Sequence, residues 1–108
     1  MQPSEVIQAL QELTSTNRKG VDALHEAENV LAEAEHKLDT AQAHSFLSAG
    51  GSVAERNAQA TLDTADQKLE RDLAKASVNR IRMKLRVIES EIMANATIAK
   101  LLQAEMRL

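Results

Sequence analysis

The sequence is poor in the residues that build compact, chemically active folds. Its 108 residues include no Cys, Trp or Tyr, one Phe, one Pro and three Gly. Without cysteine the chain has no disulfides, thiolate nucleophiles or Cys-ligated zinc sites, and it fits a reducing compartment. With a single aromatic residue, Phe46, it lacks the side chains that usually fill a globular core, and its length predicts one domain at most.

Segments for membrane insertion, secretion and catalysis are also missing. No run approaches the roughly 20 apolar residues of a membrane span, and the start of the chain, MQPSEVIQ, lacks the basic and apolar regions of a secretory signal. No Gly-x-Ser-x-Gly, P-loop or dinucleotide-binding glycine pattern is present. We therefore expect a soluble, cytoplasmic protein without a membrane partner, and a protein that is not an enzyme and has no catalytic residue and no cofactor.

The sequence does contain a heptad pattern. From Val6 to Ala41, apolar or small residues recur in alternating steps of four and three, which predicts a helix with one coiled-coil seam. Asn17 interrupts the leucine series and is expected to influence register. The run TSTNRKG over 14–20 has low helix propensity. The sequence therefore leaves two structures open, a kink or loop near residues 15–20 or a continuous helix.

The only Gly-Gly pair predicts the hinge of a helical hairpin. Gly50 is expected to take the left-handed conformation that ends a helix. Ser52 then matches an N-cap, and Glu55 completes a capping box three residues later. We expect an all-α antiparallel hairpin, a coiled coil forming a single domain, with arms over 4–48 and 53–107. Equal rise on both arms would place residues opposite each other when their numbers add up to about 101.

The second arm contains no Gly or Pro and is expected to be one helix. We expect its seam to follow Ala58, Leu62, Ala65, Leu69 and Leu73, to advance by fours through Ser77 and Ile81 as in a stutter, and to continue through Leu85, Ile88, Ile92, Asn95, Ala99, Leu102 and Met106. A two-helix hairpin has little core of its own, so we expect a homodimer or higher oligomer that forms a helical bundle. The expected interface residues are Leu24, Leu31, Leu38, Ile81, Leu85, Ile88, Ile92 and Leu102.

Two acid-x-x-His pairs have the spacing seen in di-iron helical bundles. They are Glu33 with His36 and Asp22 with His25. At roughly 100° per residue, Glu33 and His36 lie away from the seam, so we expect a solvated face and no metal site. His44 has no obvious partner and is expected on the surface near the hinge.

Charge is distributed unevenly along the chain. Residues 1–74 carry 6 basic and 13 acidic side chains, whereas residues 75–108 carry 7 basic and 3 acidic ones. Five cations and no acid lie between Lys75 and Arg86. Folding at the hinge is expected to bring some of them near two further cations and to leave a girdle of six, which we call the basic girdle. Its members are Arg18, Lys19, Arg80, Arg82, Lys84 and Arg86.

The basic girdle leaves two functions open. Lys and Arg side chains that stay unpaired would bind a nucleic-acid backbone, and the scarcity of aromatic residues predicts binding without sequence specificity. The same charges would instead pair with acidic partner helices in a scaffolding, virion-assembly or adaptor protein that binds only proteins. The two readings differ in whether the girdle stays exposed in the oligomer.

One stretch, FLSAGGSVAERNAQATLDTADQKLERDLAKASVNRIRMKLRVIESEI, and the ending LLQAEMRL resemble small helical proteins of tailed bacteriophages. The phrase GSVAER-x-A-x-A carries the likeness, which covers about two-thirds of the chain from residue 40 onward. The architecture is also similar to the helical recombination mediators of T-even phages. The resemblance implies a non-enzymatic accessory protein of phage recombination or replication in the host cytoplasm, with DNA or a phage or host protein as its partner.

Overall fold

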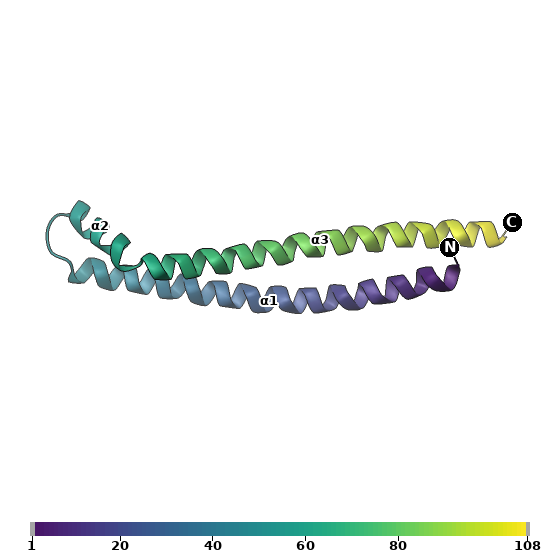
Figure 1. The fold of residues 1–108 in the computed structure, drawn as a ribbon, viewed down its shortest axis with the longest axis horizontal. Helices are drawn as coiled ribbons and strands as arrows, with labels where there is room; N and C mark the ends of the chain where they lie inside the picture. Colours follow the sequence, from purple (N-terminus) through teal and green to yellow (C-terminus); the bar gives the residue numbers. More distant parts are fainter. Residues whose placement is uncertain (1, 108) are drawn as a thin grey trace. The chain divides into compact units, whose positions relative to one another are not determined.

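The computed structural model describes residues 2–107, and it confirms the all-α class. Helix α1 spans Pro3–Ser48, α2 spans Val53–Asp63 and α3 spans Ala65–Arg107; no strand occurs in this part of the chain (Figure 1). The chain divides into two packed units. Unit 1 combines Met1–Leu24 with Arg80–Leu108, and unit 2 is His25–Asn79, which contains the hinge and forms a helical hairpin.

Helix α1 runs without interruption through residues 15–20, so the continuous alternative is the one found. The hydroxyls of Thr14 and Thr16 donate to the carbonyls four residues earlier, at 2.8 and 2.9 Å. These bonds satisfy the hydroxyls inside the helix, where they would otherwise favour a turn. Gly20 is explained by packing, because a Cβ there would lie 2.6 Å from Cδ2 of Leu85.

The hinge is confirmed, with one correction. The N–H of Ala49 donates to Ser45 O at 2.9 Å at the end of α1. Ser52 caps α2, because its hydroxyl accepts the N–H of Glu55 at 3.2 Å. The left-handed residue is Gly51, with φ of 99°, whereas the sequence analysis assigned that conformation to Gly50. Only one of the two glycines therefore needs the freedom that glycine has at positive φ.

The second arm is interrupted at Thr64, which the sequence analysis did not predict. Thr64 is only 2% exposed and has φ of −112° and ψ of 17°. Its N–H and its hydroxyl both donate to Ala60 O, at 3.1 and 2.6 Å. Helix α2 ends at Asp63 because the backbone of Thr64 departs from helical φ and ψ, and Lys68 N then donates to Thr64 O at 3.0 Å in the first turn of α3.

The register of the two arms also differs from the expectation. The residue numbers of two partners in contact add up to 108 for Ser45 with Asp63 and to 107 for Lys37 with Glu70, both in unit 2. They add up to 105 for Gly20 beside Leu85 in unit 1. The turn occupies residues 49–52, and α2 lies at an angle to α3 (Figure 1). The second arm therefore uses more residues than the first before the two helices run side by side, and the expected value of 101 is wrong.

The largest correction concerns which face of the second arm is buried. Leu62, Leu69 and Leu73, expected on the seam, are 74%, 59% and 63% exposed. The buried or half-buried positions of this region follow the series Ala60, Thr64, Gln67, Arg71, Ala74 and Val78, and Ser77 of the expected seam is half-buried beside it. This series advances in steps of four and three and continues through Ile81 and Leu85, so no stutter is needed. Small residues occupy the buried face of the second arm here. Ala34 and Leu38 of α1 are buried in the same unit, and alanine lets helix axes approach closely.

Unit 1 has larger aliphatic residues on its seam. Val6 and Leu85 are buried, and Ile88, Ile92 and Leu102 are half-buried, whereas Met106 is exposed, which corrects its place on the expected seam. Asn17 is half-buried, and its Oδ1 has no hydrogen-bond partner among residues 2–107. A buried amide of this kind lowers stability, and it is a known means of setting register. That role for Asn17 stays a prediction.

Candidate functional site

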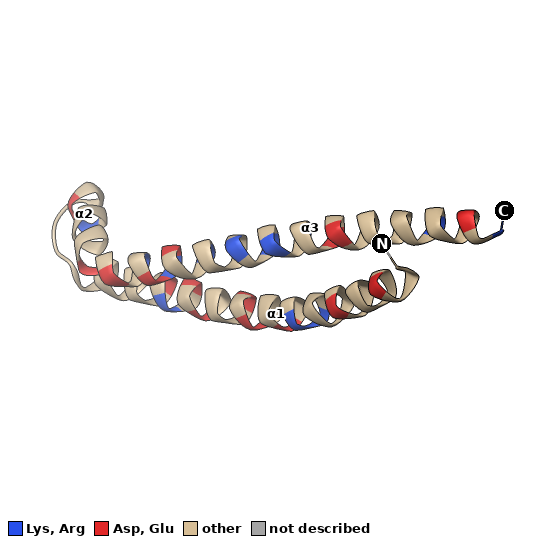
Figure 2. Cartoon of the chain, turned by 45° about the vertical axis from the view of Figure 1, so that its right-hand side comes forward, with Lys and Arg blue, Asp and Glu red and all other residues tan. Residues whose placement is uncertain are grey.

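All six members of the basic girdle are exposed. Arg18 and Lys19 lie on α1, and the other four lie on α3, all within unit 1; Figure 2 shows the basic segments of both helices in blue. In the part of the chain that the structure describes, no ion pair joins Arg18, Lys19, Arg80, Lys84 or Arg86 to a carboxylate. These five cations are therefore available to an external anion.

The girdle surrounds unit 1 and does not gather on one face. Leu85 marks the side of α3 that meets α1, because it lies against Gly20. At roughly 100° per residue, Arg80 and Lys84 then fall on one flank of α3, and Arg82 and Arg86 fall on the other. Arg18 and Lys19 are adjacent in sequence and project to opposite flanks of α1 by the same geometry. A single phosphate group would meet only part of this set.

The residues expected at an oligomer interface lie on the seam inside the chain. Leu38 and Leu85 are buried, and the others are half-buried: Leu24, Leu31, Ile81, Ile88, Ile92 and Leu102. Their role in association stays a prediction. A partner chain would find little uncovered surface on the two buried leucines.

Apolar residues that sequence reasoning placed inside are instead available on the surface. We call Leu62, Leu69 and Leu73 the leucine stripe of unit 2. In unit 1, Met83 and Val87 on α3 are exposed as well. The sequence contained the signal for this surface, because α3 carries two sets of apolar residues at heptad spacing and only one set can face α1.

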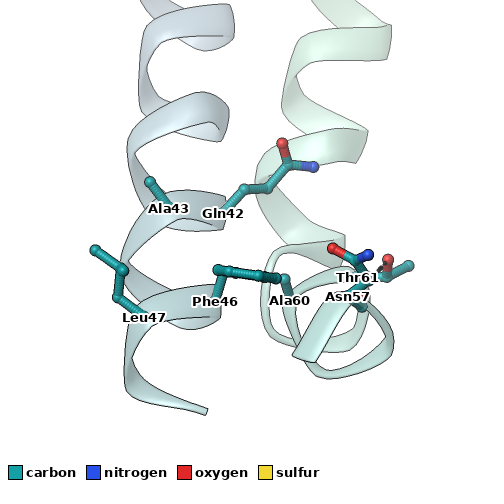
Figure 3. Close-up of a pocket in the computed structure, with 7 residues that line it drawn as sticks. All are labelled: Gln42, Ala43, Phe46, Leu47, Asn57, Ala60 and Thr61. Atoms are coloured by element: carbon teal, nitrogen blue, oxygen red, sulfur yellow. Dashed lines mark hydrogen bonds between the residues drawn. The ribbon is translucent and has the colours of Figure 1, made fainter. Parts of the chain in front are cut away.

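A shallow pocket of about 580 Å³ lies at the hinge end of unit 2. Figure 3 shows its lining residues, which come from α1 and α2: Gln42, Ala43, Phe46, Leu47, Asn57, Ala60 and Thr61. The guanidinium of Arg56 lies 5.8 Å from the centroid of the Phe46 ring, within range of a cation–π contact. The lining has amide and hydroxyl groups but no ionisable side chain, so the pocket offers packing and hydrogen bonds, with no lining group for acid–base chemistry.

A hydrogen-bonded carboxylate holds α2 against α1 near this pocket. Ser45 Oγ donates to Asp63 Oδ2 at 2.6 Å, and Gln59 Nε2 donates to Oδ1 at 2.7 Å. The bond from Ser45, with a smaller contribution from Gln59, holds the pKa of Asp63 below its ordinary value. The bonds favour the ionised carboxylate, which acts here as a structural acceptor.

The acid-x-x-His pairs lie on exposed positions of α1. Glu33, His36, Asp22 and His25 are all exposed, and His25 Nδ1 is 4.0 Å from Glu28 Oε2. Within residues 2–107, no three His, Cys, Asp or Glu side chains are grouped closely enough to hold a metal ion. His44 is also exposed, near the hinge as expected.

Two further findings concern membrane insertion and similarity to known proteins. None of the helices within residues 2–107 combines the length and the apolar character needed to cross a membrane. The chain matches no protein-family model, and no curated protein or solved structure is similar enough to count as a match.

Proposed function

We propose that the protein works by binding other protein chains through exposed helical surfaces, as a coiled-coil assembly or adaptor protein without enzymatic activity. The observation that carries this proposal is the leucine stripe. Each of these three leucines has more than half of its surface in water, and exposed apolar patches mark protein interfaces. Covering each leucine would stabilise a complex by about 1.5–3 kcal/mol before the costs of association.

A photo-crosslinking experiment tests this function. The photoreactive residue p-benzoylphenylalanine is placed at Leu69 in the full chain, and a control chain carries it at Glu33 on the exposed face of α1. We expect irradiation of cells that express the chain to give protein adducts at position 69 and none, or far fewer, at position 33. Absence of any adduct at position 69 in intact cells would contradict the proposal, and mass spectrometry identifies the chain that is captured.

Binding to a nucleic-acid backbone is the second candidate, favoured by the exposed cations of unit 1. Five members of the basic girdle have no ion pair within residues 2–107, and phosphate contacts by Lys and Arg release counterions. Titration with single- and double-stranded DNA of unrelated sequences should then give binding that weakens steeply with salt. If no binding occurs at low salt, this candidate is wrong. The phage origin, the role in recombination or replication and the cytoplasmic location stay predictions.

A further inference from the structure

The leucine stripe is bordered by carboxylates. At roughly 100° per residue, Glu70 lies to one side of Leu69 and Leu73 on α3, and Asp72 lies about equally far to the other side. Both carboxylates are about half exposed. Glu70 Oε1 accepts from Lys37 at 3.3 Å and Asp72 Oδ1 accepts from Arg71 at 2.7 Å, so the second oxygen of each carboxylate takes no part in these two bonds.

Met83 and Val87 of unit 1 are bordered by cations with the same geometry. Lys84 lies to one side of this pair and Arg86 to the other, at the angles that Glu70 and Asp72 have beside the leucines. Lys84 and Arg86 are exposed and have no ion pair within residues 2–107. Within each apolar pair the two residues are four positions apart. Helix α3 therefore carries two equivalent apolar pairs with opposite flanking charge.

From this match we infer that Leu69 and Leu73 of the leucine stripe are covered by a second copy of the same chain, whose α3 packs antiparallel to the first. This inference rests on the proposed protein-binding function and names its partner. Placing Leu69 opposite Val87 of the second copy also places Leu73 opposite Met83, because the spacings are equal and the directions opposite. The four residues then interlock as the core positions of a coiled coil do.

Charge fixes the direction of this pairing. In the antiparallel register, Glu70 lies on the same side as Lys84 of the second copy, offset by two residues or about 3 Å along the axis. Asp72 has the same relation to Arg86 of the second copy. A parallel pairing in register would instead place the Lys84 and Arg86 regions of the two copies together, and like charges disfavour that arrangement.

The arrangement is self-complementary, so it closes as a dimer. Each copy offers one acidic and one basic apolar pair on α3, and the contact is made twice about a two-fold axis. Arg80 of the second copy then lies opposite Ala76, whose small side chain leaves room for the arginine stem to reach water. A heterologous protein would need to reproduce both the spacing and the charge order, which a second copy supplies by itself.

Charge reversal tests the inference on the full-length chain. One variant carries Lys84→Glu and Arg86→Glu, and the other carries Glu70→Lys and Asp72→Lys. Each should associate about a hundredfold more weakly than the unaltered chain at low salt, because four ion pairs per dimer become contacts between like charges. An equimolar mixture of the two should recover a dimer, because both contacts of the mixed dimer again join opposite charges. Sedimentation equilibrium measures the masses, and circular dichroism checks that each variant stays helical.

The control variant carries Glu33→Lys and Glu35→Lys on the exposed face of α1, which makes the same change in charge as Glu70→Lys with Asp72→Lys but away from the stripe. It should leave the dimer unchanged. An unaltered chain that is monomeric at low salt, or charge variants whose mixture stays monomeric, would overturn the inference. If photo-crosslinking at Leu69 captures a different protein while the chain is monomeric, the inference fails and the proposed function stands; if nothing is captured, both fail.

Direction is tested separately, using the absence of cysteine from the chain. Under oxidising conditions, a mixture of Leu73→Cys and Met83→Cys variants should form a disulfide-linked heterodimer, because the two positions face each other across the antiparallel interface. Leu73→Cys alone should form little homodimer. A dominant disulfide between two copies of Leu73→Cys would indicate a parallel dimer and would contradict the proposed arrangement.

Discussion

Unit 1 and unit 2 both contain parts of α1 and α3, unit 2 also contains α2, and their net charges are of opposite sign. Unit 2 contains ten acidic and five basic side chains, whereas unit 1 contains six acidic and eight basic ones. The core of unit 2 relies on small residues such as Ala34, Ala60 and Ala74, while the seam of unit 1 uses Leu85 and larger aliphatic residues. One heptad pattern therefore supports two units whose surfaces differ in charge, and the proposed antiparallel association takes its direction from the charge order along α3.

The largest expected effect, and the clearest difference between the two units, comes from creating a cavity in the core of one unit at a time. Leu38→Ala in unit 2 and Leu85→Ala in unit 1 should each lower the free energy of unfolding of the affected unit by about 2–5 kcal/mol, because both leucines are buried. Hydrogen exchange should show the loss of protection mainly in the unit that carries the change. Leu47→Ala, at an exposed leucine of α1, is the control and should cost about 0.5 kcal/mol or less. Equal loss of protection in both units from either variant would mean that they unfold as one.

The hinge belongs to unit 2, and its two glycines should respond differently. Gly51→Ala should destabilise the protein by about 1–2 kcal/mol, because φ is 99° there and a Cβ would meet the Glu55 carboxylate. At Gly50 a Cβ would meet nothing within 4 Å and φ is not positive, so Gly50→Ala should change stability by about 0.5 kcal/mol or less. Urea denaturation measures both. Similar losses at the two positions would contradict the assignment of Gly51 as the left-handed residue.

Nucleic-acid binding, if present, should depend on unit 1 alone. Arg80→Gln with Lys84→Gln should reduce the slope of log affinity against log salt by about 1.4 on single-stranded DNA, since each phosphate contact contributes about 0.7. Gln keeps high helix propensity, so helicity should not change. Lys68→Gln with Lys75→Gln in unit 2 is the matched control and should leave the slope unaltered. A slope that responds equally to both double variants would indicate diffuse charge attraction with no site in unit 1.

The smallest effect concerns Asp63 in unit 2 and is visible only in acid. Its pKa is lowered in the folded protein, mainly by the bond from Ser45, so the ionised form stabilises the fold above the pKa of the unfolded state. That contribution should disappear as the pH falls below about 4 and through the lowered pKa of the folded state. Asp63→Asn should flatten the fall in thermal stability over this window, whereas Asp39→Asn, on the exposed face of α1, should not. If thermal stability falls with pH in the same way in Asp63→Asn as in the unaltered chain, the Asp63 carboxylate does not stabilise the fold.

The correct parts of the prediction are those that depend on residues close together in the sequence. The Gly-Gly pair with Ser52 and Glu55 predicts a helix end and a new helix start, because both depend on residues within a few positions of each other. The apolar spacing from Val6 to Ala41 predicts the buried side of α1, since a long helix needs only its own period to define a face. Thr64 was missed because threonine gives no break signal by itself; α2 ends where the backbone of this buried residue departs from helical φ and ψ.

The sequence by itself determined that the chain is helical, where it reverses and that its second arm carries two sets of apolar residues at heptad spacing. Only the tertiary structure decided which set is buried. Hydrophobicity alone favours Leu62, Leu69 and Leu73, yet Ala60, Thr64 and Ala74 lie inside. Helices approach closely only where small residues meet, and the register that continues into Val78 and Leu85 without a stutter places those small residues against α1. That choice leaves the leucines in water, and it is the reason that the candidate interface was not found from the sequence.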